Sequence, residues 1–212
     1  MVEYNYAASL GNFCFSAEVL RIVQARYRSL PFDWLFTTPR FTTRVLKDDF
    51  KQFLNPDNFI DIFDRVESIK RQAGHLLYHE NFFNHKDPRN KIDYDYYVRC
   101  INRFRDLLKL SDKKLFVCSY KNLKTEMDDV LMSDIFRLNE TLAEITDNYH
   151  IVCNINYPNN SEITHKITEK GNVTFFELYT KDENDGLNFS NGEDRSYFFK
   201  IFKSLFEYKN PN

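Results

Sequence analysis

The sequence predicts an α/β protein in which a mainly parallel sheet lies between two layers of helices, as one three-layer domain over residues 1–212. Two observations carry this prediction. Short apolar runs alternate along the chain with longer segments whose apolar residues recur at helical spacing. The apolar runs are nearly continuous, as in strands buried on both faces. With 212 residues, 42% of them hydrophobic, the chain is long enough for one full core.

In the first half of the chain, a strand over residues 4–10 ends at Gly11, and a helix begins at Cys14 and runs to about residue 27. Pro31 ends any helix and favours extended backbone before it. A second helix fits residues 39–54, because Pro39 suits a first helical turn. Residues 74–82 form the next strand candidate.

In the second half, Asp93 is expected to cap a helix that continues to about residue 108, and a strand follows over 114–120. Another helix begins at Ser133 or Asp134. Two strands are then expected, over 150–157 and 173–179, and an amphipathic helix begins at Tyr197. In such sheets ligands gather beyond the carboxyl ends of the strands. We therefore expect the site at loops such as 11–14.

Charge and cysteine content limit the functional classes. The 29 basic and 31 acidic residues give a net charge of −2, which offers no general attraction to nucleic acid. The four cysteines show no CxxC or zinc-finger spacing, and no disulfide framework or metal site is predicted. With no signal peptide or membrane-span pattern, we expect a cytoplasmic protein in a reducing compartment.

Cys14 is the cysteine whose setting suggests reactivity. It lies just after a strand and a glycine turn, at the start of a helix, where unpaired N–H groups and partial positive charge favour a thiolate. The surrounding pattern, Ser9-Leu10-Gly11-x-x-Cys14-x-x-Ala17-x-x-Leu20-Arg21 followed by Pro31-Phe32-Asp33-Trp34-Leu35, resembles a bacterial and large-virus domain family catalogued as papain-like cysteine peptidases. The segments 78–82, 96–108 and 114–120 extend the resemblance.

The resemblance implies a thiol nucleophile at Cys14 and a general base at His79, with Asp33, Glu80 or Asn81 orienting the imidazole. Backbone N–H groups around residues 12–15 would form an oxyanion hole. The candidate substrate-binding residues are Asn12, Arg21, Trp34, Glu80, Arg99 and Arg103.

Structural roles remain open for each candidate. Cys14 is equally consistent with a buried cysteine, and His75 rivals His79 as the base because it lies on the same strand face. Arg99 and Arg103 lie one helical turn apart and either clamp an anion or pair with Asp95 and Asp106. Asp33 and Trp34 are also typical of a tight turn and a filled core.

The sequence departs from papain-like enzymes in ways that affect the expected fold. The gap between Cys14 and His79 is short, and no Gln precedes Cys14 at oxyanion-hole distance. The alternation of strands and helices favours a Rossmann-like or flavodoxin-like sheet over the two-lobed papain fold.

Three functional hypotheses remain: a cysteine-dependent hydrolase or acyltransferase, a carbohydrate-pathway transferase using a nucleotide-sugar or acyl donor, and a non-catalytic binding module. The expected partner is a small-molecule, glycan or peptide substrate. The sequence identifies no cofactor and no oligomeric state.

Overall fold

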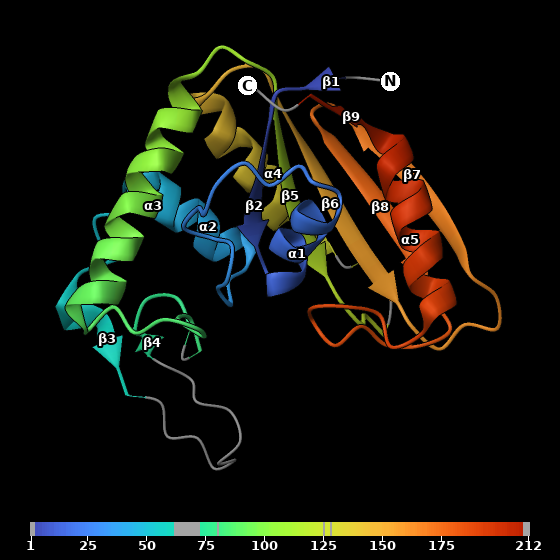
Figure 1. Cartoon of the computed structure of the whole chain (residues 1–212), viewed down its shortest axis with the longest axis horizontal. Helices are drawn as coiled ribbons and strands as arrows, with labels where there is room; N and C mark the ends of the chain where they lie inside the picture. Colours follow the sequence, from blue (N-terminus) through green and yellow to red (C-terminus); the bar gives the residue numbers. More distant parts are fainter. Residues whose placement is uncertain (1–2, 62–72, 80, 125, 128, 210–212) are drawn as a thin grey trace.

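The computed structural model describes residues 3–61, 73–79, 81–124, 126–127 and 129–209, and a five-stranded sheet forms its centre (Figure 1). The strand order is β2-β5-β6-β8-β7. The strands are β2 (Tyr6–Gly11), β5 (Lys114–Tyr120), β6 (Tyr149–Tyr157), β7 (Thr164–Lys170) and β8 (Val173–Tyr179). The first four in spatial order are parallel, and β7 is an antiparallel edge strand.

Helices cover both faces of this sheet. α1 (Cys14–Ile22) and α5 (Gly192–Leu205) share one hydrophobic cluster with the odd-numbered positions of β5, such as Leu115 and Val117. α2 (Pro39–Lys47), α3 (Lys91–Lys109) and α4 (Asp129–Ile145) share the other cluster with Phe116 and Cys118. Because successive strand residues point to opposite faces, one strand serves both cores. The predicted three-layer α/β class is confirmed, and the sheet is not divided into two lobes.

Short elements complete the fold. β1 (Glu3–Tyr4) pairs in parallel with β9 (Glu207–Tyr208), which brings the two ends of the described chain together (Figure 1). The 3₁₀ helix η1 (Pro56–Asn58) precedes β3 (Phe59–Ile60), which pairs with β4 (Gly74–His75). Along the described chain, no helix is both long and apolar enough to cross a membrane.

An aromatic cluster packs the long connection between α2 and α3 against the sheet. Phe53 is fully buried at its centre, and its ring contacts Phe82 and Phe83 at centroid distances of 5.4 and 5.5 Å. Phe32 and Tyr97 contact the same ring from the 31–35 turn and from α3. Each such ring buries a large apolar area, so this cluster fixes the backbone that leads into residue 84.

Several predicted boundaries are wrong, and the backbone shows why. α1 ends at Ile22 rather than near residue 27, because Gln24 adopts a φ of 59°. α2 ends at Lys47 rather than residue 54, since Asp49 and Phe50 also have positive φ. The strand expected over residues 74–82 is reduced to the two residues of β4.

Two other differences concern helix starts and the sheet edge. α4 begins at Asp129 rather than at residue 133 or 134, and Asn90, not Asp93, caps α3 by accepting the Asp93 N–H at 2.9 Å. The edge strand β7 was not predicted, because its sequence is polar and mostly exposed and therefore lacks the apolar run of a buried strand.

Candidate active site

The site lies where β2 ends and α1 begins, at the carboxyl edge of the parallel strands. Gly11 and Asn12 turn the chain with φ values of 85° and 76°, and Phe13 then adopts extended backbone as the N-cap of α1. A Cβ at Gly11 would lie 2.2 Å from Thr37 Cγ2, a severe overlap. Glycine at position 11 therefore serves both the backbone conformation and the close approach of Thr37.

A buried hydrogen-bond network fixes the first turn of α1 on the sheet. Ser16 Oγ lies 2.9 Å from the Gly11 carbonyl oxygen and 3.0 Å from Ser119 Oγ on β5. Asn154 lies on the neighbouring strand β6, and its Nδ2 donates to Ser119 Oγ over a distance of 3.3 Å. Because all four groups are buried, these bonds are shielded from water, and they hold the turn that carries Cys14 in one position.

The Cys14 thiol lies against the imidazole of His85. Its Sγ is 3.2 Å from His85 Nε2, although 71 positions separate the two residues. Cys14 is 7% exposed, whereas His85 is exposed to solvent. The thiol is thus shielded by the protein, and the imidazole lies between it and solvent-exposed surface.

Asn84 contacts the same imidazole nitrogen, with its Nδ2 3.3 Å from His85 Nε2. Both contacts are satisfied when Nε2 carries a lone pair and Nδ1 carries the proton. In that tautomer Nε2 accepts hydrogen bonds from the Asn84 amide and from the Cys14 thiol. This is the protonation state that a base needs to take the thiol proton.

Burial keeps both members of the pair neutral. It raises the pKa of Cys14 to about 11, against the smaller lowering effects of its own backbone N–H and of Lys121. The His85 ring is partly desolvated although the residue is exposed overall, and this lowers the pKa of His85. At neutral pH the pair is therefore thiol and imidazole rather than thiolate and imidazolium, and activation requires proton transfer within the pair.

Trp34 and Asp33 support His85 rather than contacting Cys14. The Trp34 ring packs edge-to-face on the His85 ring, with centroids 6.0 Å apart. Arg26 lies 5.6 Å from the Trp34 centroid and donates to Asp33 Oδ2 at 2.7 Å. Asp33 is 2% exposed, and its carboxylate also accepts the Leu30 N–H. Asp33 was predicted to orient the imidazole directly, but its described contacts reach His85 only through Arg26 and Trp34.

The histidine predicted as the base lies elsewhere. His79 is exposed, and its Nδ1 accepts the backbone N–H of Asn81 at 3.0 Å. The structure thus places His85, and not His79, at the Cys14 thiol. His75, the rival candidate, is buried with both ring nitrogens bonded, Nε2 to the Gln52 carbonyl oxygen and Nδ1 to the Leu77 N–H. His75 is therefore structural.

The predicted substrate-binding residues are dispersed. Asn12 lies in the turn before Cys14, and Trp34 lies beside His85. Arg21 is exposed on α1 and paired with Glu18 at 2.6 Å. Glu80 lies outside the described residues.

The two arginines of α3 do not reach the pair. Arg103 donates to the Ser29 carbonyl oxygen at 3.4 Å, and Arg99 is exposed. Within the described ranges neither contacts Cys14 or His85. The alternative pairing with Asp95 and Asp106 does not form either, because Lys91 and Lys109 pair with those carboxylates.

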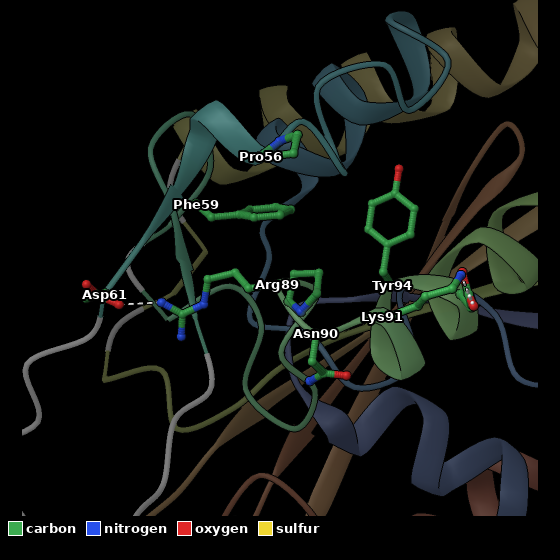
Figure 2. Close-up of a pocket in the computed structure, with 9 residues that line it drawn as sticks. Pro56, Phe59, Asp61, Arg89, Asn90, Lys91 and Tyr94 are labelled. Atoms are coloured by element: carbon green, nitrogen blue, oxygen red, sulfur yellow. Dashed lines mark hydrogen bonds and ion pairs between the residues drawn. The ribbon is translucent and has the colours of Figure 1, made fainter.

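A pocket of about 620 Å³ lies between η1 and the start of α3. Figure 2 shows Phe59 and Tyr94 on opposite sides of it, with Pro56 above Phe59. Its charged groups are paired: Arg89 with Asp61 and Asp87, and Lys91 with Asp95. Neither Cys14 nor His85 lines this pocket, so it is separate from the site at α1.

Sequence reasoning missed His85 because the segment 84–88 has the composition of a loop. Its reach to Cys14 depends on the packing of Phe82 and Phe83, which has no signature in the linear sequence. Over the described part of the chain, no group of three or more His, Cys, Asp or Glu side chains is arranged to hold a metal ion.

A cysteine at the start of a helix, paired with an imidazole at the carboxyl edge of a parallel sheet, defines the class of α/β proteins with a cysteine–histidine site. Comparison with protein families matches residues 5–153 to the family described as "putative papain-like cysteine peptidase". The chain belongs to this family. Comparison with curated proteins and with solved structures gave no significant match.

Proposed function

We propose that this protein is a cysteine-dependent acyl hydrolase in which Cys14 is the nucleophile and His85 the general base. The observation that carries the proposal is the 3.2 Å contact between Cys14 Sγ and His85 Nε2. Family membership supports a thiol mechanism, and the position at the carboxyl edge of the sheet is where α/β proteins bind their ligands.

In the proposed reaction His85 Nε2 takes the thiol proton as Cys14 Sγ attacks a carbonyl carbon. The carbonyl π electrons move to oxygen and form an oxyanion. Phe13 provides no side-chain cap for α1, and the Ser16 N–H donates to the Phe13 carbonyl oxygen at 3.4 Å. The N–H groups of Cys14 and Phe15 are therefore the candidates to stabilise this charge.

The oxyanion then collapses, and the leaving amine or alcohol departs with the proton from His85. Cys14 is left as a thioester. Water hydrolyses this thioester with His85 as the base, which releases a carboxylic acid and restores the thiol. An amine or alcohol acceptor in place of water would give acyl transfer instead, by the same balance of atoms.

A nucleotide-sugar transferase would use the arginines of α3 and the acidic segments 127–129 and 182–185 to hold its donor. Arg99 and Arg103 lie away from the Cys14–His85 pair. In the acidic loop, Asp185 Oδ1 accepts the N–H groups of Leu187 and Asn188, both at 2.7 Å, and so stabilises a turn. Part of the other acidic motif, Asp128, lies outside the described residues.

The test is hydrolysis of a panel of activated ester, thioester and amide substrates, with mass spectrometry of the trapped acyl-enzyme. We expect an acyl adduct on Cys14, which Cys14→Ala abolishes, and a loss of about 10²-fold or more in rate in His85→Ala. Exogenous imidazole should partly restore the His85→Ala rate.

His79→Ala is the matched control, because His79 is an exposed histidine of the same connection. It should retain the wild-type rate. An adduct on another cysteine, or an equal loss in the His79 and His85 variants, would refute the assignment.

A further inference from the structure

Lys121 places a positive charge beside the nucleophile. It follows directly after β5, and its Nζ lies 5.0 Å from the ring centroid of Phe13, the residue that precedes Cys14. Lys121 also lines a small cavity together with Phe15, the residue that follows Cys14. The ammonium group is therefore near the same helix start as the reactive thiol.

The surrounding loop holds this lysine in place. Gly186 has a φ of 98°, and a Cβ there would lie 3.2 Å from Lys121 Nζ and 3.6 Å from its Cε. The absence of a side chain at Gly186 thus makes room for the lysine. Reciprocal hydrogen bonds of 2.8 Å between Asn122 and Asn184 tie the loop to the residue next to Lys121. The lysine is half-buried rather than freely solvated.

Lys121 differs from Arg26, which is paired with Asp33. In the described part of the chain, no Asp or Glu forms an ion pair with Lys121. The first turn of α1 adds partial positive charge from its N–H groups. Lys121 and the helix start together make the surroundings of Cys14 favourable for an anionic group, and Lys121 lowers the pKa of Cys14.

We propose that Lys121 determines substrate specificity by binding a carboxylate close to the scissile carbonyl group. The substrate class is an acyl compound that carries a carboxylate near the bond to be cleaved, either as an acidic side chain or as a free C-terminus. This inference rests on the proposed function of Cys14. It adds the recognition of charge, which the thiol and imidazole do not provide.

The experiment compares two reagents of the same reactivity class that differ in charge. Iodoacetate carries a carboxylate and iodoacetamide is neutral; in both, the sulfur–carbon bond forms as iodide leaves. The measured quantity is the ratio of the two alkylation rates at Cys14, mapped by mass spectrometry. We expect Lys121→Met to lower the iodoacetate to iodoacetamide ratio about five- to tenfold at low ionic strength.

Two control variants test whether the charge at position 121 sets this ratio. Lys121→Arg keeps the charge and should keep the ratio close to wild type. Lys124→Met removes an exposed lysine three residues further on and should leave the ratio unchanged. High salt should reduce the wild-type ratio, because it screens the attraction. An unchanged ratio in Lys121→Met would overturn the proposal.

The outcome is separable from that of the proposed function. If alkylation of Cys14 does not depend on His85, the catalytic assignment fails, while the ratio still reports on Lys121. If Cys14 resists both reagents, acetate is titrated into the Cys14→Ser protein. The amide signals of residues 13–15 should then shift, and the shift should vanish when Lys121→Met is added. No shift in either protein would refute the subsite.

In proteins that turn over substrate, the two sources of the carboxylate are distinguished with matched peptides. One peptide has an acidic side chain next to the scissile bond and an amidated end, and the other has a neutral side chain and a free C-terminus. If Lys121→Met cleaves only one of the two peptides more slowly than the wild-type protein does, the carboxylate of that peptide is the one that Lys121 binds. If wild-type protein and Lys121→Met cleave each of these two carboxylate-bearing peptides at equal rates, the proposal is contradicted.

Discussion

Replacing His85 with glutamine tests whether the imidazole activates Cys14. The change keeps a polar side chain of similar size but removes the group that titrates near neutral pH. Because burial raises the pKa of Cys14 to about 11, only about 3 thiols in 10,000 would be ionised at pH 7.5 without a base. An ordinary cysteine with a pKa of about 8.5 would be ionised about 300-fold more often.

The greater intrinsic nucleophilicity of a high-pKa thiolate recovers part of this difference. With a Brønsted coefficient of about 0.45 the gain is roughly tenfold, so unassisted Cys14 should react about 20- to 30-fold more slowly than a free cysteine. In the proposed mechanism His85 takes the thiol proton as Sγ attacks, so no free thiolate has to form first, and this penalty should be reduced. The assay is the rate of iodoacetamide labelling of Cys14 between pH 5 and pH 10.

The two proteins should differ in the shape of their pH profiles. The wild-type rate should fall in acid, as His85 becomes protonated below the ordinary histidine pKa of about 6.5, since burial lowers its pKa in the fold. The His85→Gln rate should instead rise about tenfold per pH unit across the range. Identical profiles would refute the reasoning, and so would labelling of wild-type protein no faster than the unassisted rate.

Three further predictions concern stability, each measured by chemical or thermal unfolding. Gly11→Ala should destabilise the fold by about 2–4 kcal/mol, because it combines a positive φ with overlap against Thr37, and a change below 0.5 kcal/mol would contradict the geometry. Phe53→Ala should cost about 3–5 kcal/mol by opening a cavity among fully buried rings, whereas the exposed Ile92→Ala should cost little. Burial lowers the pKa of His75 in the folded state, so the contribution of His75 to the free energy of unfolding is fully present above about pH 6.5 and is lost as the pH falls from there toward the folded-state pKa. In His75→Gln the free energy of unfolding should therefore fall less steeply with decreasing pH.

The sequence by itself determined the class of the fold and the position of the candidate nucleophile. The near-continuous apolar runs of β5, β6 and β8 predicted strands buried on both faces, and the structure has them in parallel register. Gly11 followed by a helix start at Cys14 indicated a strand-to-helix turn, which the positive φ values of Gly11 and Asn12 confirm. These features are local, so a local pattern is enough to predict them.

The sequence did not predict the polar edge strand β7, because this strand forms through its pairing with β8. It pairs with β8 over seven residues, and its own side chains are mostly exposed. The ends of α1 and α2 were also predicted wrongly. Gln24 and Phe50 adopt positive φ, although their residue types do not favour this conformation.

Only the tertiary structure decided which histidine meets Cys14. His79 and His85 both follow β4 in the connection that leads to α3, and the sequence favoured His79 through its resemblance to a motif. The packing of Phe82 and Phe83 around Phe53 fixes the backbone between them and directs His85 to the thiol. Asp33 was likewise expected to contact the imidazole. In the structure it accepts a hydrogen bond from Arg26, and Arg26 lies over the Trp34 ring. The pairing of side chains across 71 positions is a property of the packed core, because no local propensity links residues so far apart in the chain.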